Sequence, residues 1–336
     1  MNKNPIVARA FKKFFQILLY IPIQAVFLPF AIIGVGFAVY KEIGRSRKLG
    51  ISFSAIKALQ YRWMMHYFGT RSDPLTVAFV KNLPCESHWG MLSVLGALIV
   101  SVRLSGFPDL LGKLVEPGEE TPESTAGIRV LAFDRIMEKY VDEVEQIVIP
   151  GAGFDLIALR YTENKGIKVF ELDQCDTLNI KVDTLKKAGV NHDWITYLPV
   201  DYTSESWTER LQEAGFDRSR KTLFLWQSVS LYLDAEVVRE ALRSMADLCT
   251  EGSVVAQDFY SEEFSSGQYS ESARRFLSVI EKMGEPAKFG IDMSKDPRIA
   301  VESFLRECGL EMTEYNQFGW KIGLKPFYCI VEAKKA

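Results

Sequence analysis

The chain has 336 residues, and 48% of them are hydrophobic, enough to bury one large core or two modest ones. Its formal net charge is −3 with the basic residues spread along the chain, which argues against nucleic-acid binding. Five cysteines stand far apart without a CxxC pair, and the three histidines lie at no ligand spacing. We therefore expect reduced thiols on the cytosolic side, no disulfide framework and no metal centre.

The N-terminal region contains a long uncharged segment. Residues 15–40 carry no charged side chain, and a helix of this length is sufficient to cross a bilayer. A secretory signal peptide would have a shorter apolar core followed by a small-residue cleavage site, and a buried core helix would show a polar face. We expect residues 1–50 to form a membrane anchor.

The topology of this anchor stays open. Basic residues flank the segment on both sides, at Lys3, Arg9, Lys12, Lys13, Lys41, Arg45, Arg47 and Lys48. Positive-inside bias draws both flanks to the cytoplasmic face. A single span, which the length favours, would carry one cluster across. A re-entrant segment bent at Pro22 and Pro29 would keep both clusters on one face.

A second apolar segment, residues 89–102, is short for a span. It is typical of a core helix or of a membrane-dipping wall of a pocket, and we assign residues 51–120 to a helical cap or membrane-proximal region. A stretch rich in Pro, Gly, Glu and Thr at 115–127 then leads into a different pattern. We expect one catalytic domain over residues 121–336.

That domain alternates helices and strands. Expected helices cover 128–141, 156–164, 177–189, 206–215 and 235–249. Expected strands cover 146–150, 167–173, 195–201, part of 222–233, 252–259, 311–318 and 327–335. The fold class is therefore α/β: a Rossmann-like, mostly parallel sheet with helices on both faces and an antiparallel C-terminal edge hairpin.

Two glycines and an acid follow the first strand, in "IPGAGFDL". Gly151 and Gly153 either make a tight turn or let a ligand approach the backbone, and Asp155 follows them. Leu156 occupies the third glycine position of a dinucleotide fingerprint, which disfavours NAD, and no G-K-[ST] phosphate loop is present.

Acids and an amide follow the next strands. Glu171 or Asp173, roughly 20 residues after the glycines, suits the hydroxyls of a ribose. Asp201 ends the third strand and Gln227 the fourth. Open α/β sheets bind ligands at the carboxyl ends of their strands. A nucleoside without a required pyrophosphate fits this pattern, and S-adenosylmethionine is such a ligand.

Several motifs in order resemble a known family. "IRVLAFDR", "IPGAGFD", "VFELDQ", "LPVDY" and "LWQSVSLYL" are similar to the leucine carboxyl methyltransferase-like branch of class I S-adenosylmethionine-dependent methyltransferases. The resemblance covers about residues 125–336 and leaves out the first 120. It implies that Arg129 pairs with the methionine carboxylate of the cofactor and that Gly151 and Gly153 pass beneath it. It also implies that Asp173 holds the ribose hydroxyls and Asp201 the adenine amine.

One position departs from the family. Gln227 stands where the family usually has a glutamate, so a role that needs a carboxylate there is in doubt. Tyr232 is a weak candidate for substrate contact. The departure keeps an alternative open, a membrane-anchored binding or scaffold protein without catalysis. An NAD-dependent reductase acting on lipids is a further alternative, which Leu156 disfavours.

The chemistry points to an oxygen acceptor. The methyl donor is already activated, so the enzyme mainly positions a nucleophile. A carboxylate needs no base, whereas a phenol or alcohol does, and the chain shows no convincing His/Asp pair. We expect O-methylation of a lipophilic small molecule that enters from the lipid bilayer, past 61–68 and 89–102, with the catalytic domain facing the cytoplasm.

Overall fold

The computed structural model describes residues 5–45, 49–108, 117–201, 207–321 and 325–336. The chain divides into two compact units. The helical unit consists of residues 1–51 and 59–114, and the sheet unit of residues 52–58 and 115–336. The sequence-based boundaries at residues 50 and 120 stay predictions. They do not separate residues 52–58, which the structure groups with the sheet unit, from the rest of the region 51–120.

A seven-stranded sheet organises the sheet unit, in the order β3-β2-β1-β4-β5-β7-β6. The strands are β1 (Gln146–Pro150), β2 (Lys168–Asp173), β3 (Ile195–Pro199), β4 (Thr222–Trp226), β5 (Val254–Tyr260), β6 (Leu310–Phe318) and β7 (Tyr328–Lys335). The first five pair in parallel, and β7 runs antiparallel to both β5 and β6. The predicted methyltransferase-type Rossmann-like sheet with its antiparallel edge is confirmed.

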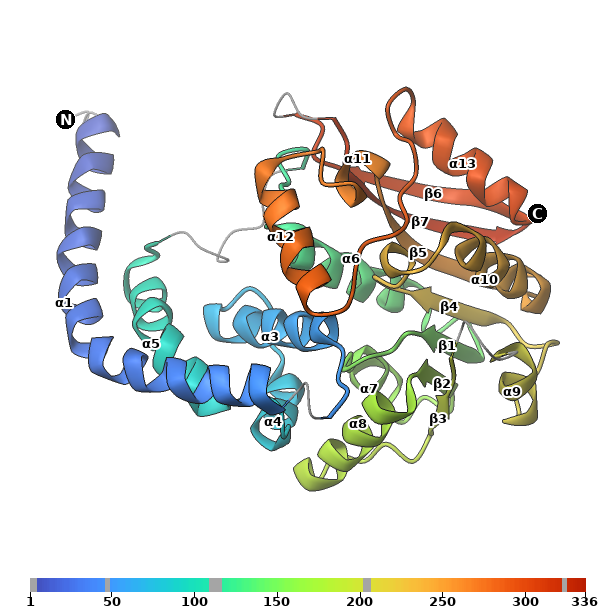
Figure 1. The fold of residues 1–336 in the computed structure, drawn as a ribbon, viewed down its shortest axis with the longest axis horizontal. Helices are drawn as coiled ribbons and strands as arrows, with labels where there is room; N and C mark the ends of the chain where they lie inside the picture. The colour runs from blue at the N-terminus through green and yellow to red at the C-terminus, as the bar shows by residue number, and fades with distance from the viewer. Residues whose placement is uncertain (1–4, 46–48, 109–116, 202–206, 322–324) are drawn as a thin grey trace. The chain divides into compact units, whose positions relative to one another are not determined.

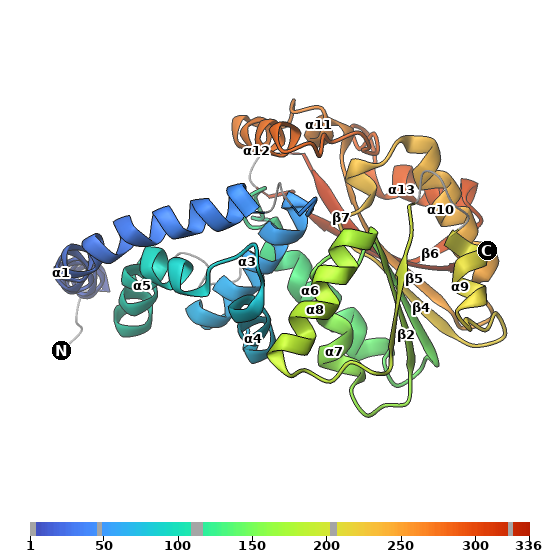
Figure 2. The ribbon, with the colours of Figure 1, turned by 60° about the horizontal axis from the view of Figure 1, so that its bottom comes forward.

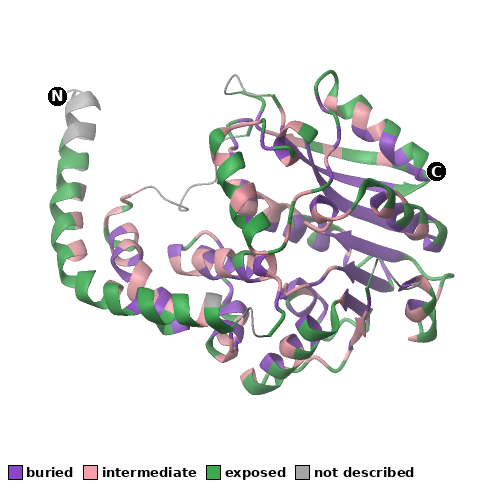
Figure 3. Ribbon diagram, in the orientation of Figure 1, coloured by how far each residue is buried: buried purple, intermediate pink, exposed green. Residues whose placement is uncertain are grey.

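Helices cover both faces of this sheet. They are α6 (Thr125–Tyr140), α7 (Ile157–Thr162), α8 (Cys175–Ala188), α9 (Trp207–Glu213), α10 (Ala235–Leu248), α11 (Glu262–Ser265), α12 (Glu271–Lys282) and α13 (Pro297–Glu307), with a 3-10 turn at Ser230–Tyr232. Figure 2 shows α6, α7 and α8 on one face and α9, α10 and α13 on the other. Every residue of β1, β4 and β5 is buried, as the purple strands of Figure 3 show, because parallel strands are covered on both faces.

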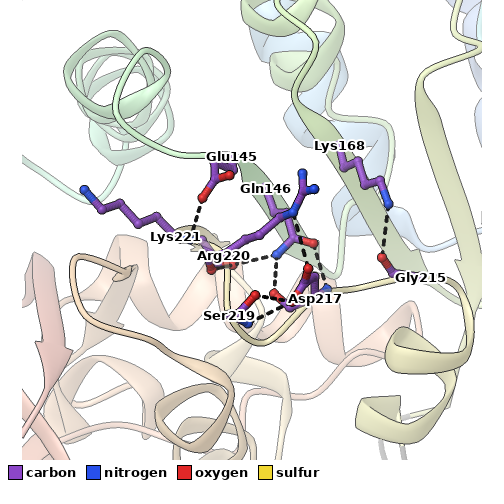
Figure 4. A network of polar contacts seen from close by, with 9 residues as sticks. Glu145, Gln146, Lys168, Gly215, Asp217, Ser219, Arg220 and Lys221 are labelled. Atoms are coloured by element: carbon purple, nitrogen blue, oxygen red, sulfur yellow. Dashed lines mark hydrogen bonds and ion pairs between the residues drawn. The ribbon is translucent and has the colours of Figure 1, made fainter.

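The amino-terminal edge of the sheet is fixed by a polar network (Figure 4). The buried Gln146 amide donates to the Asp217 carbonyl oxygen at 2.8 Å and accepts from the Asp217 N–H at 2.9 Å. The Asp217 carboxylate in turn accepts from the backbone and the hydroxyl of Ser219. These contacts hold the loop before β4 against the start of β1, at the edge opposite to the one where ligands bind in such sheets.

The helical unit contains α1 (Pro5–Val39), a π-helical turn (Tyr40–Arg45), most of α3 (Phe53–Phe68), α4 (Pro74–Asn82) and α5 (His88–Ser105). α1 continues through Pro22 and Pro29, and Figures 1 and 2 show it turning part-way along its length. Proline inside a helix removes a hydrogen bond and kinks the axis. Among the described residues, Lys13–Glu42 and His88–Ser105 are long and apolar enough to cross a membrane, by length and composition alone.

Candidate active site

The glycine turn after β1 depends on both of its glycines. Gly151 and Gly153 have positive φ angles of 70° and 47°, which residues with a side chain rarely adopt. The N–H groups of Gly151 and Ala152 donate to the Leu172 carbonyl oxygen at 2.7 and 3.0 Å, which ties the turn to β2. A Cβ atom on Gly151 would stand 2.3 Å from Val229, so the turns that follow β1 and β4 pack directly together. This is the point where the strand order reverses, the usual ligand position in such sheets.

Asp173 ends β2 and faces this turn. One carboxylate oxygen accepts from the Gly153 N–H at 2.7 Å, and the other accepts from the Gln174 N–H at 2.7 Å. Burial raises the pKa of Asp173 above its ordinary value, and the two N–H donors partly offset that rise. Each oxygen keeps a lone pair for a further donor, such as a hydroxyl group.

Glu171, the other acid considered for the ribose, instead forms an ion pair within the protein core. It is buried, and its carboxylate lies 2.6 Å from Nζ of the equally buried Lys181 on α8. Burial raises the pKa of Glu171, and the ammonium group of Lys181 opposes the rise. Lys181 also donates to the backbone carbonyl of Asp155, while the Asp155 carboxylate accepts from the Ile157 N–H at 3.0 Å. Asp155 and Lys181 therefore hold the end of the glycine turn and the start of α7.

Arg129 projects from α6 toward β5. Its Nη1 lies 3.4 Å from the Tyr260 hydroxyl and 4.0 Å from Asp258 Oδ2, and only 11% of its side chain is exposed. Burial would lower the pKa of Arg129, but Tyr260, Tyr328 and Asp258 raise it above its ordinary value. Its Nε is buried without a hydrogen-bond partner among the described residues. This charged donor has capacity left for an anion.

Asp258 is a central residue that sequence reasoning missed. It accepts from the Ser228 N–H at 2.6 Å and from the Tyr328 hydroxyl at 2.7 Å. Ser228 has a φ of 60°, a strained value for a residue with a side chain, and such strain concentrates at functional sites. An acid at the end of the apolar strand "VVAQDFY" is the signal that could have identified Asp258.

Tyr232 lies beside the short segment that the N-terminal part of the chain contributes to the sheet unit. The Glu285 carboxylate accepts from the backbone N–H groups of Phe53 and Ser54 at 2.8 and 2.9 Å, which caps the start of α3. Burial raises the pKa of Tyr232, and the neighbouring Ser54 side chain opposes that rise. A Cβ atom on Gly153 would lie 3.3 Å from Cβ of Ala55. Residues 52–58 thus border both the glycine turn and Tyr232.

The predicted site residues fall into two groups. The structure brings Gly151, Gly153, Asp155 and Asp173 together in one turn, and it places Arg129 and Tyr232 toward β5. Asp201 is exposed two residues past β3, next to Val200, whose N–H donates to the Asp173 carbonyl oxygen. Gln227 is half-buried directly after β4, before the strained Ser228. The cofactor contact of each residue stays a prediction.

Comparison with known proteins agrees with this geometry. Residues 114–246 match the family model for leucine carboxyl methyltransferase. The chain is 28% identical over 250 residues to a protein of Mycolicibacterium paratuberculosis and 29% identical over 251 residues to one of Mycobacterium tuberculosis, each named by inference as an S-adenosyl-L-methionine-dependent methyltransferase. Both matches cover 72% of this chain and 77% of the relative.

Solved structures are more distant. The mitomycin 7-O-methyltransferase aligns with a TM-score of 0.43 and 15% identity, over 63% of this chain and 56% of the other. The magnesium protoporphyrin IX methyltransferase from Synechocystis PCC 6803, solved with S-adenosylhomocysteine, aligns with a TM-score of 0.40 and 11% identity, over 65% of this chain and 90% of the other.

The region that matches the family model contains β1, β2 and β4 and the turns that follow them, and the strand order is that of a methyltransferase sheet. The chain is therefore an S-adenosylmethionine-dependent methyltransferase that is similar to the leucine carboxyl methyltransferase-like branch of class I, and S-adenosylmethionine is its cofactor.

Proposed function

We propose that this methyltransferase works at a membrane surface and methylates an oxygen, on a carboxylate or a hydroxyl group, of a lipophilic small molecule. The sheet unit faces the cytoplasm, where S-adenosylmethionine is present. The observation that carries the oxygen-acid part of the proposal is the buried position of the Arg129 guanidinium, with the Tyr260 hydroxyl 3.4 Å from its Nη1.

The residues of the turn and of β5 suit the cofactor. Arg129 has a buried Nε available for the methionine carboxylate, and Asp173 has acceptor capacity left for the ribose hydroxyls. Asp201 and Gln227 are the candidates for the adenine side of the site. The cofactor supplies a methyl group already activated on a sulfonium, so the protein binds, orients and excludes water rather than activating the donor.

The acceptor side favours a group that is ionised before it binds. Burial raises the pKa of Tyr260 to about 12 and raises that of Tyr232 as well, so both phenols keep their protons at neutral pH. They donate hydrogen bonds but do not serve as general bases. His192, the histidine of the sheet unit, precedes β3 and so lies at the opposite edge of the sheet. A carboxylate, which needs no base, is therefore the preferred acceptor.

The lipophilic character of the acceptor rests on the helical unit. Most of the α1 side chains from Phe11 to Val39 that the structure describes are apolar and exposed (Figure 3). Exposed apolar surface of this extent marks a membrane or protein interaction site. A membrane-bound enzyme draws on substrates that partition into lipid.

The experiment is a methyl-transfer assay with S-adenosylmethionine labelled on its methyl group. Full-length protein in lipid vesicles receives, in separate reactions, a long-chain fatty acid, the matching fatty alcohol, the matching fatty amine and a lipophilic phenol. We expect label on the acid, released as methanol by mild alkali because methyl esters hydrolyse. Alkali-stable label on the alcohol or phenol would show hydroxyl methylation instead, and alkali-stable label on a nitrogen or carbon acceptor only would overturn the proposal.

A further inference from the structure

We infer that α1 and α5 form one monotopic membrane insert, which enters and leaves the lipid bilayer by the same face, and that neither helix crosses it. This inference rests on the membrane association proposed above and adds a topology and a second membrane element. It follows from the packing of the two helices and from the path of the chain on either side of them.

α1 exposes apolar side chains around most of its circumference. The half-buried or buried positions recur about every four residues, along one stripe at 16, 20, 23, 24, 27, 31, 34 and 38. Large side chains between them are exposed, among them Phe15, Leu18, Ile21, Leu28, Phe30, Ile33 and Phe37. One stripe of α1 is thus covered by packing, and the rest of its surface presents mainly apolar side chains. Such a helix fits lipid better than water.

α5 occupies that stripe and runs antiparallel to α1. A methyl group added at Gly34 would lie 2.6 Å from Ser93 Cβ and 2.9 Å from the Gly90 carbonyl oxygen, and one added at Gly96 would lie 2.9 Å from the Phe27 ring. At the far end, Gln16 Nε2 donates to the Ser105 carbonyl oxygen at 2.6 Å. Small residues at such contacts let helix backbones approach closely, as they do in membrane proteins.

This packing couples the topology of the two helices. α5 follows α1 backward from Gly34 to Gln16, so a bilayer that α1 crosses over this length is also crossed by α5. The chain would then return to its starting face at the end of α5. Residues 42–87 would lie on one side of the membrane and residues 115–336 on the other.

The sheet unit excludes that arrangement. It includes residues 52–58, and the Glu285 carboxylate accepts from the N–H groups of Phe53 and Ser54. One folded unit cannot lie on both sides of a bilayer. The connection 106–114 cannot bring the chain back through lipid, because its nine residues include the charged Asp109 and Lys113 and are far fewer than the roughly 20 apolar residues that a span requires. Both helices must therefore leave the membrane on the face they entered.

Charge at the ends of the helix pair agrees with this topology. Lys13 and Arg103 lie near one end of the pair, and Lys41 and Arg45 near the other. Lys41 donates to the Glu86 carbonyl oxygen and Arg103 to the Tyr67 carbonyl oxygen. With both ends on the cytoplasmic face, these four basic residues meet anionic headgroups and none of their charges has to cross. The occupant of the apolar surface is thus the acyl region of an anionic cytoplasmic leaflet.

The test is cysteine accessibility in the full-length protein. Native Cys175 is exposed and reports on the sheet unit, whereas Cys85, Cys249, Cys308 and Cys329 are buried. Single cysteines replace Phe11, Gly44 and Leu104, each in a Cys175→Ser background. A membrane-impermeant maleimide is applied to sealed right-side-out and inside-out vesicles from cells that express each variant. S-adenosylmethionine binding in each variant shows that the sheet unit is folded.

We expect Phe11→Cys, Gly44→Cys, Leu104→Cys and native Cys175 all to react in inside-out vesicles and none in right-side-out vesicles. Reaction of Phe11→Cys and Gly44→Cys from opposite faces would establish a span and overturn the inference, while membrane association would stand. Failure of the full chain to float with vesicles containing an anionic lipid would overturn both. A soluble dimer that protects the α1 positions would show that a second copy, and not lipid, covers this surface.

Discussion

Asp173 holds the glycine turn and also faces the ligand position, so its removal has a sharp consequence. Asp173→Ala deletes the acceptor of the Gly153 N–H and the charged acceptor proposed for the ribose. Loss of two charge-assisted hydrogen bonds weakens S-adenosylmethionine binding by roughly 2–4 kcal/mol. Calorimetric titration of the variant against the parent measures this, with the exposed Asp292→Ala as a matched control and NADH as a second ligand. Unchanged cofactor affinity in Asp173→Ala would place the ribose elsewhere.

The Asp173 carboxylate should also make S-adenosylmethionine binding weaker at acid pH. Burial raises the pKa of Asp173, and its ionised form is the hydrogen-bond acceptor. Binding is therefore complete above that raised pKa and is lost as pH falls through it, at a higher pH than the ordinary aspartate value of about 3.9 would give. Dissociation constants measured from about pH 7 down to pH 4 report the midpoint. The Asp173→Asn variant cannot ionise at this position, so it should bind S-adenosylmethionine weakly and with an affinity that does not fall at acid pH. If its affinity falls at the same pH as that of the parent, another group causes the pH dependence.

Sequence reasoning found the residues whose role follows from their place on one strand. Gly151 and Asp173 stand where strands end, and parallel strands bring their carboxyl ends to one edge. The position of Asp258 near the end of β5 was open to the same reasoning, but its contact with Tyr328 was not. Glu285 was missed because it caps Phe53 and Ser54, which are distant in the sequence. No local pattern encodes contacts between such remote segments.

At the scale of elements, the Lys181–Glu171 pair links α8 to β2 inside the core. Lys181→Met removes the ammonium group but leaves Glu171 buried without its cation, which costs about 3–5 kcal/mol of folding free energy. Lys181→Met combined with Glu171→Leu removes both charges and should recover most of that loss. Urea unfolding of the two single variants and the double variant gives the coupling energy. Additive losses would mean that the two side chains do not interact.

The α1–α5 contact can be tested with two glycines of one helix. Gly34→Leu would force a side chain against Ser93 and the Gly90 backbone, whereas Gly36→Leu meets nothing within 4 Å. Both changes have the same intrinsic effect on helix propensity, so their difference reports packing. We expect Gly34→Leu to abolish disulfide cross-linking between cysteines placed at positions 16 and 105, and Gly36→Leu to preserve it. Equal cross-linking in both variants would contradict the packing.

Most elements were predictable because the sheet unit alternates buried strands with amphipathic helices. On α10, for example, Val238, Ala241, Leu242 and Met245 are buried at helical spacing. The N-terminal helix α1 was predictable only as a long apolar segment. Whether such a segment spans or re-enters depends on its partner helix, and no sequence pattern announced that Gly34 would pack on Gly90 and Ser93.

At the scale of the molecule, residues 52–58 join the N-terminal half of the chain to the cofactor site. Two truncations separate this role from membrane binding. A chain that starts at Ser52 keeps residues 52–58, which Glu285 caps and which border Gly153. It lacks α1, so α5 no longer has the helix that packs against it. A chain that starts at Val115 loses both.

The first truncation should bind S-adenosylmethionine as the full chain does, yet still float with vesicles, because α5 then exposes the face that packed against Gly34 and Phe27. The second should not float, and its cofactor affinity should fall roughly tenfold or more, since Glu285 loses two charge-assisted hydrogen bonds and the Ser54 side chain beside Tyr232 is removed. Vesicle flotation and calorimetric titration measure the two properties on the same preparations, and circular dichroism confirms that each truncation is folded. Equal cofactor affinity in the two folded truncations would show that residues 52–58 pack beside the site without contributing to it, and the coupling between this segment and the cofactor would be absent.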